Sequence, residues 1–361
     1  MTSVHTPADT RIAYRECASL AEAGYDVVLI APGTARLPPG VRLRSLPVPA
    51  NRLARMTQTM WRVYRAALDE RADIYHFHDP ELIFVGLLLK MRGARVIFDV
   101  HEDIPSDIAD KRWIPRALRP PVGAAVATVL KVLHARYNAI VTATPTIARH
   151  FPDGHTVVIC NYPRIEELAP PASAAFEQRP SNAVYLGNIT ELRGIVELMQ
   201  AYDRPEMPAQ SRLILAGEFE DAELSRRIKA MPGWQRVDFL GWCDRSRVAD
   251  ALSRARVGLV TLRPARNFED ALPVKMFEYM GAGLPVIISK TIRAGRIVVD
   301  HDCGIAVDPM NPGEIARAIR FFVENPARAR EMGERGRELV LERYQWFNEA
   351  QKLQRLYAAI A

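Results

Sequence analysis

The chain lacks the segments that would place it in or across a membrane. No apolar run reaches the roughly 18–20 residues of a membrane-spanning helix, and the longest candidate, residues 121–133, is interrupted by Lys131. The first residues lack the basic start and apolar run of a secretory signal peptide. The four cysteines are scattered without metal-ligand spacing, which predicts reduced thiols. We therefore expect a cytoplasmic protein.

A strong excess of one charge is also absent. The chain has 48 Lys and Arg against 42 Asp and Glu, for a net charge of +6. This mild excess fits anionic substrates or an anionic membrane surface. No zinc finger, RNP-like aromatic strand or clear helix-turn-helix pattern is present, so nucleic acid is not an expected partner. A length of 361 residues is too great for one ordinary core and predicts two domains.

Hydrophobic runs of strand length alternate with segments of helical spacing, such as residues 12–23 and 53–70. This alternation is typical of α/β domains with parallel sheets and crossover helices. The expected strands of the first half are 26–31, 74–77, 95–100, 139–142 and 156–159. Those of the second half are 183–186, 212–216, 237–240, 257–260, 285–288 and 305–307.

The composition between the two halves changes at residues 166–181, which carry three prolines among alanines and acids. Such a segment is typical of a linker. We therefore expect domains at 1–165 and 182–345, followed by a last helix at 346–361. Only residues 1–4 are left for the strand that normally opens an α/β domain. Either that strand is very short or the true start lies upstream.

Residues 270–285 are the most informative segment of the chain. Asp270 and Glu278 stand eight positions apart, with Pro273 and Lys275 between them. Proline suits the first turn of a helix, because its φ is fixed and its missing N–H has no partner there. A helix that starts near Pro273 would direct free N–H groups at an anion. The segment therefore predicts a sugar-nucleotide site, with the diphosphate at the helix start and the acids on hydroxyl groups.

This pair of acids resembles the signature of the retaining glycosyltransferases of sequence family 4. That family usually has glutamate at both ends, whereas this chain has Asp270, and the adjacent Glu269 is the alternative acid. The resemblance covers nearly the whole chain. It implies a GT-B fold, an α/β architecture of two Rossmann-like domains whose parallel sheets face each other across a cleft. It also implies that the nucleotide-sugar binds mainly to the second domain and that the last helix, 346–361, crosses back to the first domain.

Residues 185–194 resemble the diphosphate loop of the same family, in which a glycine turn lets the phosphates approach the backbone. Gly187 supplies that turn, and Asn188 and Arg193 stand where the family has an arginine and a lysine. Lys275 is then expected to compensate for the lost cation. The resemblance further implies that Glu278 holds the ribose hydroxyls and Asp270 the transferred sugar. The loop at Gly241 and Trp242 would lie at the edge of the base.

No metal and no other cofactor is expected, because nothing resembles a paired-aspartate motif for a divalent cation. His76 and His78 are metal-like residues on one strand face, but we assign His78, Asp79 and Glu81 to the lining of a cleft at a strand end. Arg193, Lys275 and helix N–H groups would neutralise the leaving diphosphate instead, which is the logic of metal-independent transfer in this family.

The acceptor side is expected in the first domain. His101 matches a family histidine that approaches the donor sugar, and Glu102 follows it in the same loop. His5 and Asp9 belong to a start that resembles one subgroup of the family. Asp9 is a candidate N-cap, and Arg11 is either a phosphate contact or a solvated side chain.

Residues 111–120 combine four cations with a tryptophan, which is typical of a surface that meets anionic lipids. The alternative is a cationic loop that docks on its own domain.

The sequence thus predicts a retaining glycosyltransferase that moves a hexose-type sugar from a nucleotide-sugar to a glycan or lipid-linked acceptor, in the cytoplasm or at the inner face of the membrane. Two alternatives remain at this point: a degenerate, non-catalytic partner of a transferase and a nucleotide-sugar 2-epimerase.

Overall fold

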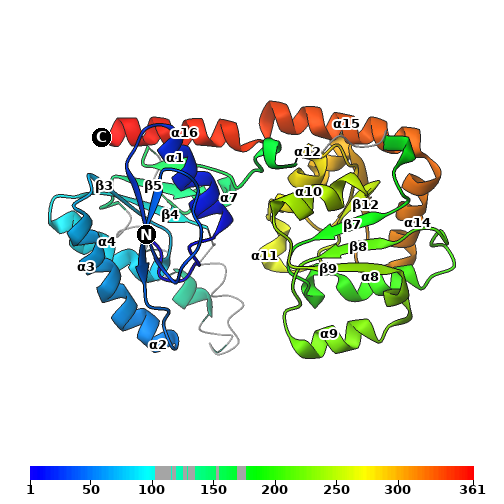
Figure 1. Cartoon of the computed structure of the whole chain (residues 1–361), viewed down its shortest axis with the longest axis horizontal. Helices are drawn as coiled ribbons and strands as arrows, with labels where there is room; N and C mark the ends of the chain where they lie inside the picture. The colour runs from blue at the N-terminus through cyan, green and yellow to red at the C-terminus, as the bar shows by residue number, and fades with distance from the viewer. Residues whose placement is uncertain (102–114, 116–118, 125–127, 129–134, 152–153, 169–175) are drawn as a thin grey trace. The chain divides into compact units, whose positions relative to one another are not determined.

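The computed structural model describes the chain except for residues 102–114, 116–118, 125–127, 129–134, 152–153 and 169–175. The chain divides into two compact units (Figure 1). The first unit contains residues 1–161 together with 346–361, and the second contains residues 162–345. Each unit is an α/β domain with parallel strands, as the sequence predicted.

The strands of the first unit form two parallel sheets. One pairs β1 (Val27–Pro32) with β2 (Val41–Leu46), and the other has the order β3 (Ile74–Phe77), β4 (Arg95–Val100), β5 (Ala139–Thr142) and β6 (Thr156–Val158). A π-helical segment, Thr10–Cys17, leads into α1 (Ala18–Glu22). Further helices of this unit include α2 (Arg52–Ala54), a π-helical turn (Arg55–Thr59), α3 (Met60–Glu70), α4 (Ile83–Met91), α7 (Pro145–Ala148) and α16 (Trp346–Ile360).

Helices cover both faces of the four-stranded sheet. Successive side chains of a strand point to opposite faces, and both sets are apolar here, so each face needs a covering layer. On one face, Phe77 and Phe98 pack with residues of α3 and α4, such as Val63 and Leu89. On the other face, the next residues along β4 and β5 pack against Leu20 of α1 and against α16. The last helix of the chain therefore belongs to the core of the first unit.

The second unit contains one parallel sheet of the order β12-β11-β10-β7-β8-β9. Its strands are β7 (Ala183–Leu186), β8 (Leu213–Ala216), β9 (Val237–Gly241), β10 (Val257–Val260), β11 (Val286–Ser289) and β12 (Gly304–Val307). Its helices are α8 (Ile195–Tyr202), α9 (Ala222–Lys229), α10 (Arg245–Ser253), α11 (Arg266–Glu269), α12 (Val274–Gly281), α13 (Gly295–Asp300), α14 (Pro312–Glu324) and α15 (Pro326–Arg343). Figure 1 shows α8 and α9 on one side of this sheet and α10 and α12 on the other.

The central strands β7, β8, β10 and β11 are buried along their whole length, which is why they read as continuous apolar runs in the sequence. Leu198 of α8 and Ile319 of α14 pack into one core with β7, β8 and β10. On the other face, the Leu186 N–H at the end of β7 donates a hydrogen bond of 2.8 Å to the hydroxyl oxygen of Tyr279 in α12. This bond ties α12, the helix between the two acids, to the diphosphate loop.

One prediction about organisation was wrong, and one strand was missed. The predicted linker at 166–181 does not separate the units, since the chain passes from one unit to the other between Asn161 and Tyr162. The turn Ile165–Leu168 buries Ile165 and Leu168, and Phe176 packs against the core of the second unit. The strand β2 was not predicted, because its alternating arginines hide it from a search for apolar runs. No helix among the described residues has both the length and the apolar character needed to cross a bilayer.

Candidate functional site

The strand order of the second unit creates a switch point at β7. The chain adds β8 and β9 on one side of β7, whereas β10, β11 and β12 lie on the other side. In open α/β sheets, ligands bind outside the carboxyl ends of the strands at such a point. The predicted diphosphate loop follows β7, so it lies at this position.

Arg193 and Lys275 converge on Gly187, the first residue after β7. Gly187 has a φ of 108°, and a Cβ added to it would lie 3.5 Å from Lys275 Nζ and 3.6 Å from Arg193 Nη1. Gly194, with a φ of 81°, lets the loop pack on the end of β10, since a Cβ there would lie 2.1 Å from the Thr261 carbonyl oxygen. The geometry therefore places two cations over a backbone turn without a side chain.

The ammonium of Lys275 has no hydrogen-bond partner among the described residues, although Nζ is buried. It lies 3.8 Å from the centre of the Tyr185 ring. Burial lowers the pKa of Lys275 well below its ordinary value of 10.5, and the charge of Arg193 lowers it further against the attraction of Glu278. A bound anion would supply the missing acceptor, so this group is prepared for a negatively charged ligand.

Glu278 is buried and already paired. Arg245, at the start of α10, contacts Glu278 Oε1 through Nη1 at 2.8 Å and Glu167 through Nε at 3.3 Å. The carboxylate of Glu278 is therefore held in one position by a cation that the sequence analysis did not single out. The sequence feature that could have drawn attention to Arg245 is its position at the start of a helix, directly after Asp244, the N-cap of α10.

Asp270 and Glu269 share one cation, Arg293. Arg293 contacts Asp270 Oδ1 through Nε at 3.0 Å and Glu269 Oε1 through Nη2 at 3.6 Å, and its N–H donates to the Glu269 carbonyl at 2.9 Å. Pro273 is the N-cap of α12 and precedes its first turn by one residue, which is a small correction to the prediction. Both acids thus lie in front of α12, beside the residues assigned to the diphosphate.

The remaining donor-side residues lie at neighbouring strand ends. Asn188 is exposed, and its carbonyl accepts a hydrogen bond of 2.9 Å from the Tyr185 hydroxyl. Gly241 ends β9 with a φ of 66°, and its carbonyl accepts a hydrogen bond of 2.8 Å from Gly217. Trp242, which follows, is 67% exposed. An exposed indole beside this site offers a stacking surface for a base.

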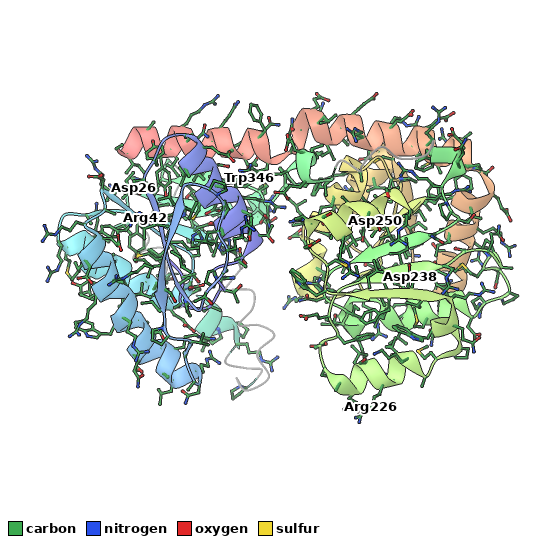
Figure 2. The ribbon with its side chains drawn as sticks, viewed as in Figure 1. Asp26, Arg42, Arg226, Asp238, Asp250 and Trp346 are labelled. Carbon is green, nitrogen blue, oxygen red and sulfur yellow. The ribbon has the colours of Figure 1, made fainter. Side chains whose placement is uncertain are left out.

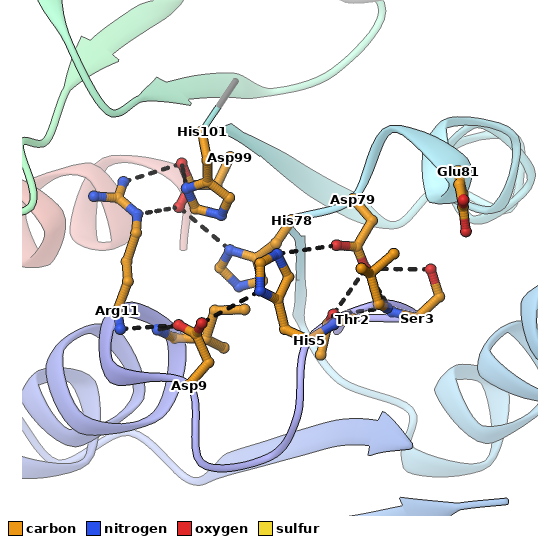
Figure 3. A network of polar contacts seen from close by, with 12 residues as sticks. Thr2, Ser3, His5, Asp9, Arg11, His78, Asp79, Glu81, Asp99 and His101 are labelled. Atoms are coloured by element: carbon orange, nitrogen blue, oxygen red, sulfur yellow. Dashed lines mark hydrogen bonds and ion pairs between the residues drawn. The ribbon is translucent and has the colours of Figure 1, made fainter. Parts of the chain in front are cut away.

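A polar network in the first unit connects the loop after Met1 to the ends of β3 and β4 (Figure 3). Asp79 accepts hydrogen bonds from the Ser3 N–H, from Thr2 Oγ1 at 2.8 Å and from the Val4 N–H at 3.2 Å. His5 lies between two carboxylates, 3.2 Å from Asp9 and 3.4 Å from Asp79. Asp79 therefore holds the loop that presents His5.

Asp9 is the N-cap of the first helical segment, as predicted. Its Oδ1 accepts from the N–H groups of Arg11 and Ile12, each at 2.9 Å. Burial opposes ionisation of this carboxyl, but the hydrogen bonds from His5 and Ile12 outweigh it and lower its pKa to about 2. Asp9 is thus a carboxylate at neutral pH.

Neither interpretation of Arg11 was right. Its side chain is buried, contacts Asp99 through Nε at 3.1 Å and Nη2 at 3.0 Å, and contacts Glu16 at 2.9 Å (Figure 3). Glu16, His76, His78 and Asp99 are the group of described residues that could ligate a metal, with ligand atoms within 4.8 Å of one another. Arg11 already supplies positive charge to both carboxylates of that group.

His101 and His78 stack with their ring centres 5.3 Å apart, next to Asp99. Burial lowers the pKa of His78 to about 3 and that of His101 to about 4, against the attraction of Asp99. Both imidazoles are therefore neutral at physiological pH. The nitrogens of His101 have no hydrogen-bond partner among the described residues, so the ring can bind a hydroxyl. Glu102, expected in the same loop as His101, lies outside the described residues, and Glu81 pairs with Arg55 at 2.8 Å.

The comparisons with known proteins agree with this geometry. A family model described as glycosyl transferases group 1 matches residues 170–339, and a glycosyl transferase 4-like domain matches residues 10–161. The D-rhamnosyltransferase WbpZ of Pseudomonas aeruginosa is 24% identical over 274 residues, which are 74% of this chain and 68% of WbpZ. The lipopolysaccharide core biosynthesis glycosyltransferase LpsD of Rhizobium meliloti is 24% identical over 300 residues, covering 78% and 83% of the two chains.

A solved structure with the same fold is HepE of Anabaena in complex with UDP and glucose. Its TM-score is 0.73 at 14% identity, with 98% of this chain and 97% of HepE covered. The two family models together account for nearly the whole chain. The protein belongs to the group 1 glycosyl transferases and has the GT-B fold, with an N-terminal domain of the glycosyl transferase 4-like type.

Proposed function

We propose that the protein is a retaining glycosyltransferase that moves a hexose-type sugar from a nucleotide-sugar to a hydroxyl group of a glycan acceptor. The observation that carries the donor half is the buried Nζ of Lys275, which has no hydrogen-bond partner among the described residues and lies with Arg193 over Gly187. A diphosphate placed there would accept hydrogen bonds from both cations at a strand-end switch point.

The other donor-side residues complete the proposal. Glu278 Oε1 is held by Arg245, and we assign the second oxygen, Oε2, to the ribose hydroxyls. Asp270, or Glu269 beside it, would engage the transferred sugar, and Trp242 would lie against the base. Arg293 contacts both acids, so it would orient whichever of the two binds the sugar.

In the proposed reaction, the bond between the sugar carbon and the diphosphate breaks, and its electron pair goes to the leaving phosphate oxygen. The acceptor oxygen forms its bond on the same face of the sugar, and its proton passes to the leaving phosphate. Lys275 and Arg193 would stabilise the charge that develops on that phosphate, which preorganised cations do effectively. The proposal assigns no metal to this step.

We assign the acceptor to the first unit, near His101, His5 and Asp9. The neutral ring of His101 can donate to or accept from a sugar hydroxyl without carrying a charge. The names of WbpZ and LpsD, a rhamnosyltransferase and a lipopolysaccharide core transferase, support an acceptor in cell-surface polysaccharide or glycolipid synthesis. HepE, solved with UDP and with UDP-glucose, supports a nucleotide-sugar donor.

The test is calorimetry with UDP-, GDP-, ADP- and TDP-sugars, with and without EDTA, followed by NMR of the product. Binding of one nucleotide series that EDTA does not change, and a product with the donor's anomeric configuration, are expected. Donor binding without turnover for any acceptor would favour the degenerate partner. Release of an epimerised donor without acceptor would favour the 2-epimerase. An inverted product would contradict the retaining mechanism.

The proposed function includes a peripheral contact with the inner face of the membrane. The predicted segment 111–120 lies largely outside the described residues, but α2, the π-helical turn after it and α3 expose Leu53, Met56 and Trp61, with Arg62 and Arg65 also exposed on α3. The guanidinium of Arg65 lies 5.2 Å from the centre of the Trp61 ring. Apolar and cationic side chains on one helix surface suit anionic lipid head groups.

We therefore expect the protein to cosediment with phosphatidylglycerol vesicles and much less with phosphatidylcholine vesicles. Trp61→Gln should weaken this binding several-fold. Phe347→Gln is the matched control and should not weaken it, because Phe347 is an exposed aromatic residue on another helix, α16. Equal loss in both variants, or no binding to anionic vesicles, would contradict the contact.

A further inference from the structure

The two sheets of the first unit are separated by a groove of about 540 Å³. It is lined by β1 from Val27 to Ile30 on one side and by β3 from Ile74 to His76 on the other. Glu16 and Leu20 from the first helices and Tyr357 from α16 also line it. β1 and β3 are not bonded to each other, because they belong to different sheets. The groove therefore runs between two strand edges.

The residues Met1 and Thr2 already bridge those two edges at one end of the groove. The Thr2 N–H donates to the Ile30 carbonyl at 3.0 Å, the Met1 nitrogen donates to the His76 carbonyl at 2.6 Å, and the His78 N–H donates to the Met1 carbonyl at 3.2 Å. A chain bonded on both sides in this way occupies the place of a strand. β1 and β3 are accordingly two inter-strand spacings apart, with room for one strand between them.

The bonds also fix the register. Suppose that residue j of one strand lies opposite residue i of a parallel strand. The N–H of residue i then donates to the carbonyl of residue j−1, and the carbonyl of residue i accepts from the N–H of residue j+1. Both bonds of Met1 to β3 therefore place it opposite Phe77, and the bond of Thr2 places it opposite Ala31. Ahead of Met1 and Thr2, β1 and β3 then offer the same number of residues for pairing with an added strand. These are Val27, Val28 and Leu29 on β1 and Ile74, Tyr75 and His76 on β3, all of which line the groove.

Unused hydrogen-bonding groups face this space. The N–H and C=O of one residue in a strand point to the same side, and alternate residues point to opposite sides. Because the carbonyls of Ile30 and His76 face Met1 and Thr2, the N–H groups of these two residues face the groove. His76 Nε2 and Glu16 Oε2, whose residues line the groove, lack a hydrogen-bond partner among the described residues, whereas Glu16 Oε1 is paired with Arg11.

We propose that this groove is a strand slot, filled in the folded protein by residues that precede Met1 in the same polypeptide. They would run parallel to β1 and β3, join them into one continuous sheet and continue through Met1 and Thr2 into the loop that Asp79 holds. The open end of the slot is charged and exposed: Asp26 and Arg42 line it and pair at 3.1 Å (Figure 2). The incoming chain would therefore be apolar inside the slot and polar at this mouth.

The test extends the full chain at its start. One protein carries Met-Lys-Ile-Val-Val before Met1, which puts three β-branched residues in the slot and lysine at the mouth. Its matched control carries Met-Lys-Ile-Pro-Val, in which proline removes the N–H that would bond to the Ile74 carbonyl. The readouts are thermal unfolding and hydrogen exchange of the Ile30 and His76 amides, so neither depends on the proposed enzyme activity.

With the valine extension, we expect a melting temperature several degrees higher and exchange of the two amides roughly tenfold slower than in the control. Equal exchange in both extended proteins would overturn the slot. Protection of these amides in the protein of residues 1–361 that rises with its concentration would mean that a second copy supplies the strand, and would overturn the assignment to the same polypeptide. The protein isolated from its source should have an intact mass above 40.5 kDa, and a mass equal to that value would overturn the assignment as well.

Discussion

At the scale of single residues, the proposed donor site contains a lysine whose charged form is unfavourable without a bound anion. Burial and Arg193 hold the pKa of Lys275 well below its ordinary value. A diphosphate at Gly187 would raise that pKa, so donor binding should take up protons. Calorimetry of UDP-sugar binding in buffers of different ionisation enthalpy measures this uptake directly.

Lys275→Met should abolish that proton uptake and lower kcat/KM roughly 10²–10³-fold, the range for losing one preorganised charge contact. The free protein should be no less stable, because a desolvated ammonium is removed. Lys290→Met is the control, since Lys290 lies in the same unit and pairs with Asp308 on the surface. Normal turnover in the Lys275 variant would contradict the diphosphate assignment.

His101, proposed to lie on the acceptor side, should make the stability of the protein depend on pH. Its pKa is lowered from 6.5 to about 4 by burial, against the attraction of Asp99. Between these values the unfolded chain binds more protons than the folded one, so stability is present above pH 6.5 and is lost as the pH falls toward 4. At pH 5 the loss from this group is roughly 2 kcal/mol relative to neutral pH.

Urea unfolding of the wild type and of His101→Gln at pH 7.5 and pH 5 checks this shift. The glutamine variant should gain roughly 2 kcal/mol on the wild type as the pH falls. The difference in unfolding free energy between the two proteins cancels the contributions of the other buried groups. One of these is Glu16, whose raised pKa changes the stability with pH in the opposite direction. A constant difference at both pH values would show that His101 titrates normally.

At the scale of elements, glycines let the turns after β7, β8 and β9 lie against one another. The Gly187 N–H donates to Ala216 at 2.9 Å and the Gly217 N–H to Gly241 at 2.8 Å. Gly217 has a φ of 145°, and a Cβ there would lie 2.0 Å from the Gly187 carbonyl oxygen. The backbone of the diphosphate loop therefore leaves no room for a side chain on the next turn.

Gly217→Ala should cost the second unit more than 2 kcal/mol and weaken donor binding, because Gly187 must move. Gly93→Ala separates the two contributions: its φ of 84° is also positive, but nothing lies within 4 Å of the added Cβ. That variant should lose only about 1 kcal/mol. Equal losses measured by thermal unfolding would mean that backbone conformation alone, without the close contact, sets the cost.

The sequence predicted the elements that carry a strong hydrophobic signal. β3, β4, β5, β7 and β10 begin and end where the apolar runs did. β2 was missed because Arg42 and Arg44 alternate with its apolar residues on an edge strand. Among the site residues, the approach of Arg193 and Lys275 to one turn could be expected from parallel strand ends. The pairing of Arg245 with Glu278 could not, since a long side chain reaches an acid 33 positions away.

At the scale of the whole molecule, the chain leaves the first unit at Asn161 and returns to it at Trp346. The boundary could not be read from composition, because the proline-rich residues lie after the crossing and their flanks pack into the second unit. The return was expected from the family resemblance. Trp346 is its anchor: it is 2% exposed and its Nε1 donates a hydrogen bond of 2.8 Å to Ser19 Oγ (Figure 2).

Trp346→Ala should therefore destabilise the first unit by about 3–5 kcal/mol, the range for removing a large buried aromatic side chain. Hydrogen exchange should accelerate in peptides from residues 1–101 and 345–361, and remain unchanged in peptides from β7 to α14. Phe347→Ala is the matched control, because the neighbouring side chain is 61% exposed and its loss should leave both units as they are. If exchange accelerated equally across both units, the two would unfold as one cooperative body, and the last helix would support more than the first unit.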